Sequence, residues 1–249
     1  GMPAVGITDH GNMHGAYEMY TNCVANGVKP IIGIEAYVTP ETARQDKSRV
    51  HWGTEAQRRD DVSGGGLITH LTMWAENDEG LVNLIKASSV ANLEGRVMRY
   101  PRMDKEVLAT YSKGVIASSG CPSGIIQTRL RLGQFDEALR AAGEFQDIFG
   151  KDNFFIELMD HGLPIETQVT GDLLTIAKKL NAPLLATNDS HYVHAEDAQA
   201  QDAMLCINSG SRLDDPDRFK FDGTGYYIKT AEEMRELFKD HPDACDNTL

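Results

Sequence analysis

Six side chains of types that commonly bind metal ions lie inside or directly after short apolar segments of this 249-residue chain. They are His10, Glu35, His70, Cys121, Asp189 and His191. Glu35 lies inside the apolar run 31–38, where an unpaired carboxylate is costly to bury, so it needs a cation or a proton. Imidazole, carboxylate and thiolate groups together predict a multinuclear transition-metal site, with Zn²⁺ favoured over Mg²⁺ and with Mn²⁺ or Fe²⁺ as alternatives.

Each of these residues also has an ordinary structural alternative. A lone histidine in a strand is more often a hydrogen-bonded core residue than a ligand. Asp189 and His191 give a stronger signal, because Asp-x-His directly after an apolar run places both groups at one strand end. Cys23 and Cys206 fall at apolar positions of predicted helices, where we expect buried thiols. The prediction of a metal site therefore depends on the six residues as a group.

The reaction class follows from what closely spaced divalent ions do. They activate a water molecule and stabilise the attacking and leaving oxygens of a phosphoryl group during in-line displacement. The predicted site therefore favours phosphoester hydrolysis. Hydrolysis of an amide, or deaminase-type hydrolysis, is the second alternative.

The elements that position these residues are predicted from alternating apolar and amphipathic segments, which are typical of an α/β protein with parallel strands. Strands are expected at 4–8, 30–38, 67–75, 114–118, 153–158 and 183–187, with helical patterns that include 13–26, 135–145 and 173–180. The metal-binding residue types fall at strand ends, where parallel barrels form their active sites. Because there is no glycine-rich dinucleotide loop, we expect a closed or nearly closed barrel rather than a doubly wound sheet.

Two stretches do not follow this alternation. Segment 41–66 is polar, mixed in charge and ends in three glycines, so we expect a long surface loop. The pattern after residue 209 is weaker and indicates a short strand at 226–229 followed by a helix at 231–239.

Charge and composition limit the partners. The net charge of −13 argues against DNA binding through a broad basic face, so contact with DNA would be local or through bound metal ions. We find no apolar run long enough to span a membrane and no signal-peptide pattern, which predicts a soluble cytoplasmic protein. The four cysteines are widely spaced and do not indicate a disulfide framework.

Six motifs follow one another along the chain: ITDHG at 7–11, GIEAYV at 33–38, THLT at 69–72, GCPSG at 120–124, ELMDHG at 157–162 and TNDSHY at 187–192. In this order they resemble the polymerase and histidinol phosphatase (PHP) domain of the bacterial DNA polymerase III alpha subunit, in its actinobacterial form. The resemblance covers essentially the whole chain.

The resemblance implies a fold, a ligand set and partners. The fold would be a distorted (β/α)₇ barrel with up to three metal ions, bound here by His10, Glu35, His70, Cys121, Asp189 and His191. The activity would be metal-dependent 3′–5′ hydrolysis of DNA, with a proofreading role. The partners would be primer-template DNA, the polymerase palm and thumb of the same chain, and replisome subunits such as the sliding clamp.

One departure from the family pattern matters. The family begins with a His-x-His strand and a nearby Asp, ahead of the position where this chain starts. We therefore expect residues 1–249 to be a fragment of a longer protein: one PHP domain lacking its first motif, bordering the palm at its C-terminal end, holding about one ion and hydrolysing weakly or not at all. His161 is expected to be a second-layer or phosphate contact, or else structural.

Two other functions remain open at this point. A non-catalytic scaffold for the polymerase is favoured by the acidic charge. A free-standing phosphatase, such as histidinol phosphatase, would share the fold but not the polymerase-like features.

Overall fold

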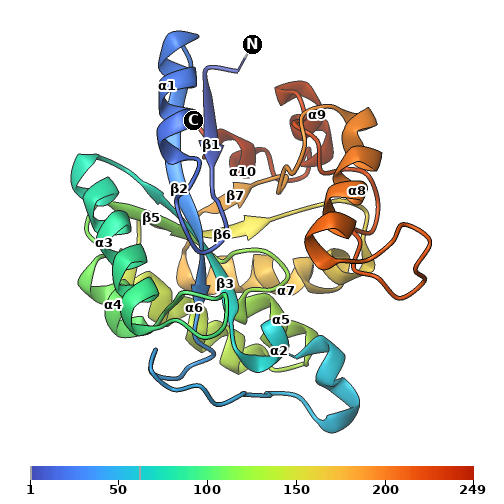
Figure 1. Ribbon diagram of the computed structural model, residues 1–249. Coiled ribbons are helices and arrows are strands. Elements are labelled where there is room, and N and C mark those ends of the chain that lie inside the picture. The colour runs from blue at the N-terminus through green and yellow to red at the C-terminus, as the bar shows by residue number, and fades with distance from the viewer. Residues whose placement is uncertain (1, 62) are drawn as a thin grey trace.

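The structure, a computed structural model, describes residues 2–61 and 63–249, and its centre is a curled sheet in the strand order β1-β2-β3-β5-β6-β7 (Figure 1). The strands are β1 Ala4–Ile7, β2 Lys29–Val38, β3 Thr69–Ala75, β4 Arg102–Met103, β5 Val115–Ser118, β6 Phe154–Leu158 and β7 Leu184–Ala186. The six strands predicted from the sequence are all present, and β4, which pairs with β2, was not predicted.

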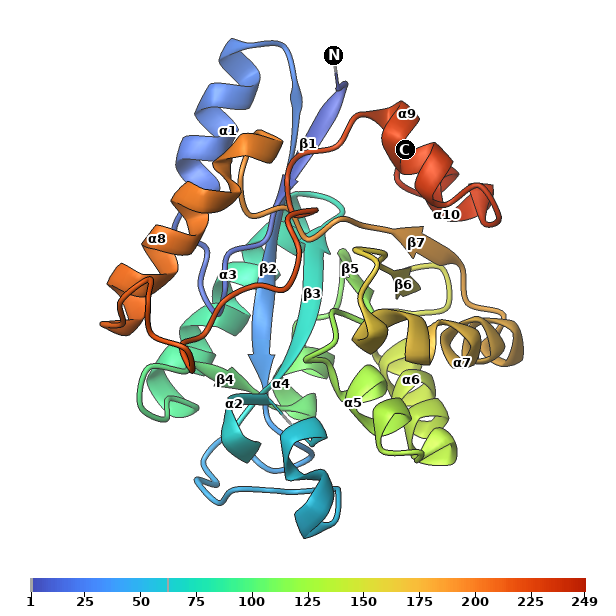
Figure 2. The ribbon, with the colours of Figure 1, turned by 90° about the vertical axis from the view of Figure 1, so that its right-hand side faces the viewer.

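Helices surround the sheet. They are α1 Ala16–Ala25, α2 Ser63–Gly66, α3 Asp78–Glu94, α4 Lys105–Thr110, α5 Ile125–Arg131, α6 Phe135–Phe149, α7 Pro164–Leu180, α8 Ala198–Ser209, α9 Ala231–Leu237 and α10 Pro242–Asp246, with 3₁₀ helices η1 Glu55–Asp60 and η2 Ala195–Asp197. Helices α5, α6 and α7 lie together on one side, and α9 and α10 lie beyond β7 (Figure 2). The architecture is a mixed α/β fold with a half-barrel sheet, as expected for a distorted (β/α) barrel.

The expectation that all strands run parallel is wrong at β3. This strand pairs antiparallel with β2 and with β5, whereas the β1–β2, β5–β6 and β6–β7 pairs are parallel. A parallel neighbour would need a crossover back along the sheet. Segment 39–68 instead stays at the end of β2, so that Thr69 starts β3 opposite Val38. The first residues of β3 therefore lie at the end of the sheet where the parallel strands finish.

The register divides the sheet into a polar face and an apolar face. Glu35 pairs with Thr72, and Tyr37 pairs with His70, so their side chains share one face. The alternate residues of β2 and β3 point the other way into the hydrophobic core, among them Ile34 (fully buried). This core continues through α3, α6 and α7 to α10.

Segment 41–66 and the region after residue 209, the two stretches without a regular pattern, differ in part from expectation. Segment 41–66 is a surface connection that carries η1 and α2 rather than an unstructured loop, and the Arg129 guanidinium fixes it by lying 3.9 Å from the Trp52 ring centroid. The predicted strand at 226–229 is wrong, because only a single bridge joins Tyr227 to Tyr192. The predicted helix at 231–239 is confirmed as α9.

Among the helices in the described ranges, none is long and apolar enough to cross a membrane. Cys23 and Cys206 are buried free thiols, as predicted.

Candidate metal centre

Four of the six predicted ligands form a compact group around one carboxylate. We call His10, Glu35, His70 and Cys121 the Glu35 cluster. The Glu35 Oε1 atom lies 2.6 Å from His70 Nδ1, and Oε2 lies 3.4 Å from His10 Nε2. The Cys121 Sγ atom lies 3.5 Å from both Glu35 Oε1 and His70 Nδ1. The ligand atoms of His10, Glu35 and His70 lie within 4.8 Å of one another, an arrangement that could hold a metal ion.

The backbone explains how His10 reaches Glu35. After β1 the chain continues alongside β2, where the Glu35 N–H donates to the Asp9 carbonyl (3.0 Å) and the Gly11 N–H donates to the Glu35 carbonyl (2.8 Å). Gly11 has φ +69°, and a Cβ there would lie 2.6 Å from the Tyr37 ring. Glycine is therefore required for the backbone to pass this close to the site.

The Gly-Cys-Pro turn after β5 brings Cys121 to the same place. The His70 N–H donates to the Ser123 carbonyl (3.1 Å), and the Gly124 N–H donates to the Cys121 carbonyl (2.8 Å). Gly120 opens the turn at φ +79°. Although His70 lies at the start of its strand, the antiparallel direction of β3 places it beside this turn.

The cluster carries opposing electrostatic effects. Burial opposes ionisation of Glu35, but the hydrogen bond and charge of His70, with the charge of His10, hold the pKa of Glu35 below its usual range. Burial, with the nearby carboxylates Glu35 and Asp189, raises the pKa of Cys121 well above its usual value. A cation at this position would favour the thiolate instead.

The remaining two predicted ligands, Asp189 and His191, lie on the loop after β7, and we call them the loop pair. The His191 Nδ1 atom lies 2.7 Å from the Asp189 carbonyl oxygen and 3.7 Å from Asp189 Oδ1. The His191 ring centroid lies 6.5 Å from that of His10, so the pair faces the Glu35 cluster without joining the tight group. Burial raises the pKa of Asp189, and the charge of Glu35 adds to this effect.

The loop pair is supported by residues whose role the sequence left open or did not reveal. The His161 Nδ1 atom lies 2.6 Å from Glu166 Oε1, and Nε2 lies 2.9 Å from the Asn188 carbonyl oxygen. Burial opposes the charged imidazole, but the Glu166 carboxylate outweighs it and raises the pKa of His161. With a side chain 1% exposed and partners for both ring nitrogens, His161 supports the loop, and a phosphate contact stays a prediction.

Segment 225–229 holds the same loop from the other side. Asn188 Nδ2 donates to the Tyr227 carbonyl (2.7 Å) and to the Gly225 carbonyl (3.0 Å), and Lys229 Nζ donates to Asn188 Oδ1 (2.7 Å). The His191 N–H donates to the Tyr226 carbonyl (2.8 Å). Segment 225–229 is therefore held by these contacts and not by the strand pairing predicted at 226–229.

Glu157 on β6 connects the two halves of the site. Its carboxylate accepts hydrogen bonds from the Ser118 hydroxyl on β5 and the Thr187 hydroxyl after β7. Burial raises the pKa of Glu157 to about 7, and the charges of Asp189 and Glu35 contribute to the rise. The sequence signals for this residue were a charge inside the apolar run 154–158 and its place at the start of the motif at 157–162, neither of which identified its partners.

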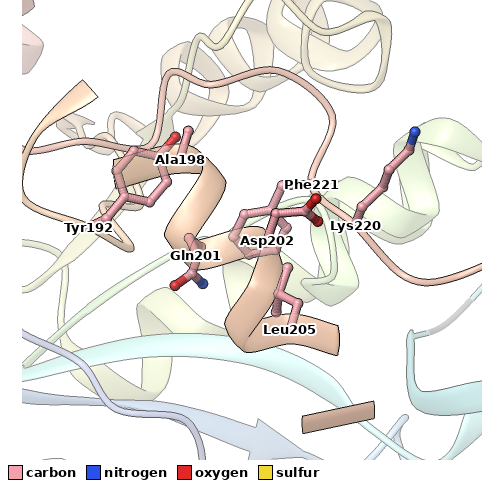
Figure 3. A pocket seen from close by; sticks show the side chains of 7 residues that line it. All are labelled: Tyr192, Ala198, Gln201, Asp202, Leu205, Lys220 and Phe221. Atoms are coloured by element: carbon pink, nitrogen blue, oxygen red, sulfur yellow. The ribbon is translucent and has the colours of Figure 1, made fainter. Parts of the chain in front are cut away.

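A hollow beside α8 lies next to the loop pair, and its lining includes Tyr192, Gln201 and Phe221 (Figure 3). The Phe221 ring lies edge-on to His191, with 4.6 Å between ring centroids. None of the six predicted ligands lines the hollow. We therefore place the candidate metal centre by its converging donor atoms, which a hollow alone does not supply.

Comparison with known proteins identifies the family. The PHP domain family matches residues 1–161. DNA polymerase III subunit alpha of Mycobacterium tuberculosis is 56% identical over 250 residues, that of Mycobacterium leprae 55% over 249, and that of Borreliella burgdorferi 40% over 248. Each alignment covers 100% of this chain but only 20–21% of the relative, so the chain spans about a fifth of the length of these proteins.

A solved structure from Bifidobacterium adolescentis, provisionally described as a metal-dependent phosphoesterase, aligns over 76% of this chain and 77% of its own. Its TM-score of 0.38 and identity of 15% are too low to support an inference about the present site. The family match covers more than half of the 249 residues and includes the whole Glu35 cluster. The chain therefore belongs to the PHP domain family.

Proposed function

We propose that the chain acts as the metal-dependent phosphoesterase domain of a bacterial replicative DNA polymerase. The observation that carries the proposal is the Glu35 cluster facing the loop pair across 6.5 Å between the His10 and His191 rings, in a chain of the PHP family. The similarity to DNA polymerase III alpha subunits supports the polymerase context.

All six residues fit the proposed role as metal ligands: His10, Glu35, His70, Cys121, Asp189 and His191. Their nitrogen, oxygen and sulfur donors suit Zn²⁺, with Mn²⁺ or Fe²⁺ as alternatives. We propose about one ion per chain, at the Glu35 cluster, out of up to three in the family. Divalent ions bound here would supply an activated water and charge stabilisation at a phosphoryl group.

The protein's own residues would prepare the site for the 3′ end of DNA. Glu35 accepts from His70 and lies against His10, so it fixes the orientation of both rings. Asp189 and His191 close the opposite side, where they could orient the phosphodiester. The reaction we propose is removal of nucleotides from the 3′ end, with proofreading in the complete polymerase.

Further proposals follow from the polymerase context. Residues 1–249 would act as one phosphoesterase domain beside the palm and thumb of the polymerase. Its partners would be primer-template DNA and, through the rest of the polymerase, replisome subunits such as the sliding clamp. Its location would be the cytoplasm, where bacterial DNA is replicated.

The test is an assay on 5′-labelled single-stranded and primer-template DNA, with Mn²⁺ or Zn²⁺, read on a sequencing gel. We expect slow shortening from the 3′ end, lost in Asp189→Asn and kept in Asp136→Asn, which changes an exposed carboxylate at the start of α6. A complete polymerase that contains this domain and leaves both substrates intact, when metal-loaded and without nucleotides, would contradict the hydrolytic proposal.

That result would favour the second candidate, a non-catalytic scaffold for the polymerase. The net charge of −13 is the observation in its favour, because a nuclease usually offers basic surface to phosphates. Release of phosphate from a small phosphomonoester, with DNA left intact, would instead favour a free-standing phosphatase.

A further inference from the structure

We infer that Tyr37 and the turn 96–100 form a docking platform for the end of a single-stranded DNA beside the metal centre. The inference rests on the proposed function and identifies where its substrate strand would lie. None of these residues belongs to the Glu35 cluster or the loop pair.

The rings of Tyr37 and Tyr100 form a continuous aromatic surface, which we call the aromatic wall, that extends from the Glu35 cluster. Tyr37 lies two residues beyond Glu35 on the same face of β2, and its ring centroid lies 5.5 Å from that of His70 and 6.1 Å from that of His10. The Tyr100 ring follows, edge-on to Tyr37 with 5.1 Å between centroids and an interplanar angle of 88°. Tyr37 and Tyr100 are both partly exposed.

Positive charge lies at the outer end of this wall. The Arg99 guanidinium carbon lies 5.4 Å from the Tyr100 ring centroid, and the Arg99 charge also acts on Tyr37. Arg96 and Arg99 are exposed. Within the described ranges neither forms an ion pair with a carboxylate, in contrast to Arg44 and Arg140. Two unneutralised guanidinium groups beside the site are notable in a chain of net charge −13.

The turn is held in place before any ligand arrives. Val97 and Tyr100 exchange two backbone hydrogen bonds of 2.9 Å. Just beyond the turn, the Arg102 side chain is fully buried and donates to backbone carbonyls, including that of Gly95 (3.1 Å) at the other end of the turn. Met98 occupies the tip with φ +54°. A preformed turn avoids part of the ordering cost of binding.

This combination matches the chemistry of single-stranded nucleic acid. Bases stack on aromatic side chains, and cationic groups follow the phosphates. A base against Tyr100 would leave its phosphates near Arg96 and Arg99, with the strand end directed along Tyr37 toward the Glu35 cluster. Duplex DNA would need a broader basic surface than this acidic chain offers.

The experiment measures binding of a labelled oligo-dT by fluorescence anisotropy, in chelator and at low salt, so that metal chemistry does not contribute. We expect Tyr100→Ala to weaken binding about fivefold or more, and Tyr100→Phe to retain it because the stacking face remains. Arg96→Ala and Arg99→Ala should each lower the slope of log K against log salt by about 0.7. The matched control is Arg235→Ala on α9, far from the turn in Figure 1.

Several outcomes would overturn the platform. These are absence of measurable oligo-dT binding by the unaltered protein, equal loss in Arg235→Ala, or wild-type binding in folded Tyr100→Ala. A matched oligo-U strand and a DNA duplex test the alternatives: tighter binding of either contradicts a single-stranded DNA site. The binding assay contains no divalent ion, so its result does not depend on hydrolysis. If the protein binds oligo-dT but does not cleave it when Mn²⁺ is added, the proposed hydrolysis fails and the platform stands.

Discussion

The two halves of the candidate metal centre are built differently. The Glu35 cluster is held by strand register and by contacts among its own members, such as the 2.6 Å contact between His70 and Glu35. The loop pair lies beyond the end of β7, and Asp189 adopts a left-handed φ of +45°. Its position depends on two other segments, through His161 and through the hydrogen bonds of Asn188.

This difference determines which substitutions can disrupt each half of the site. The Glu35 cluster is sensitive mainly to changes of its own members and of the glycines that position them, such as Gly11, whereas the loop pair can be displaced by changes in distant segments that touch no ligand. The same loop could adjust its position when an ion or a substrate binds, because it has no ladder of backbone hydrogen bonds to break. The following predictions test this contrast.

The largest effect should come from Glu35→Gln. The substitution keeps the size of the side chain but removes the charge that His10 and His70 share, so affinity for Zn²⁺ or Mn²⁺ should fall by about 100-fold or more, beyond the 10- to 100-fold typical of outer-layer changes. Titration against a chelating dye measures this. The control is Glu18→Gln on the exposed face of α1, and retention of wild-type affinity in Glu35→Gln would remove the Glu35 cluster from the metal centre.

The second prediction concerns the buried pair His161–Glu166, whose side chains are 1% and 5% exposed. His161→Ala leaves the Glu166 carboxylate buried without its imidazole partner, although the His161 backbone N–H still donates to it, so the free energy of unfolding should fall by about 3 kcal/mol. Cleavage of DNA, to which the loop pair would contribute, should fall about 10- to 100-fold, while Co²⁺ bound at the Glu35 cluster keeps its thiolate absorption.

A double change separates support of the loop from stability alone. His161→Leu with Glu166→Leu removes both charges and should recover much of the lost stability. It does not restore the hydrogen bond to the Asn188 carbonyl, so cleavage of DNA should remain low. If the double variant recovers cleavage together with stability, His161 is merely structural.

The same contrast explains what the sequence could predict. Glu35 was recognisable because a charge in an apolar strand needs a partner, and the strand itself is present. His70 was predicted at the correct end of the sheet for the wrong reason, because the antiparallel direction of β3 is set by the preceding connection and not by its own residues. Strand β4 was missed because two residues, Arg102 and Met103, are too few to show a pattern.

The residues that hold the loop pair in place could not be predicted from the sequence, for a different reason. His161 contacts Glu166 five residues away, but also Asn188, which is 27 residues away. The strand predicted at 226–229 is absent, because this segment is held by side-chain contacts from Asn188 and Lys229 and not by a neighbouring strand. Such tertiary contacts leave no periodic signal in a single sequence.

The third prediction probes Cys121. Burial and nearby carboxylates keep its thiol protonated in metal-free protein, so labelling by iodoacetamide should be slow but should accelerate as the pH rises. Bound Zn²⁺ should abolish labelling, because the sulfur is then occupied. Peptide mass analysis with and without chelator measures both, and Cys245 serves as an internal control. Equal labelling of Cys121 in both states would exclude it as a ligand.

The smallest effect should come from Glu157, which joins the two halves through Ser118 and Thr187. Its pKa is about 7 in the folded protein against a usual 4.5, so the protonated form is the one that the fold favours. The stability it contributes is therefore fully present below pH 4.5 and is lost as the pH rises through 7. In metal-free protein, the melting temperature should fall between pH 5 and pH 8, by about 2–4 °C for each kcal/mol lost.

Glu157→Gln should flatten that fall, and so should Mn²⁺ in the unaltered protein, because a nearby cation favours the carboxylate. Thermal melts across this range would measure the effect, and a variant as pH-sensitive as the unaltered protein would show that the raised pKa of Glu157 is not the cause of the fall.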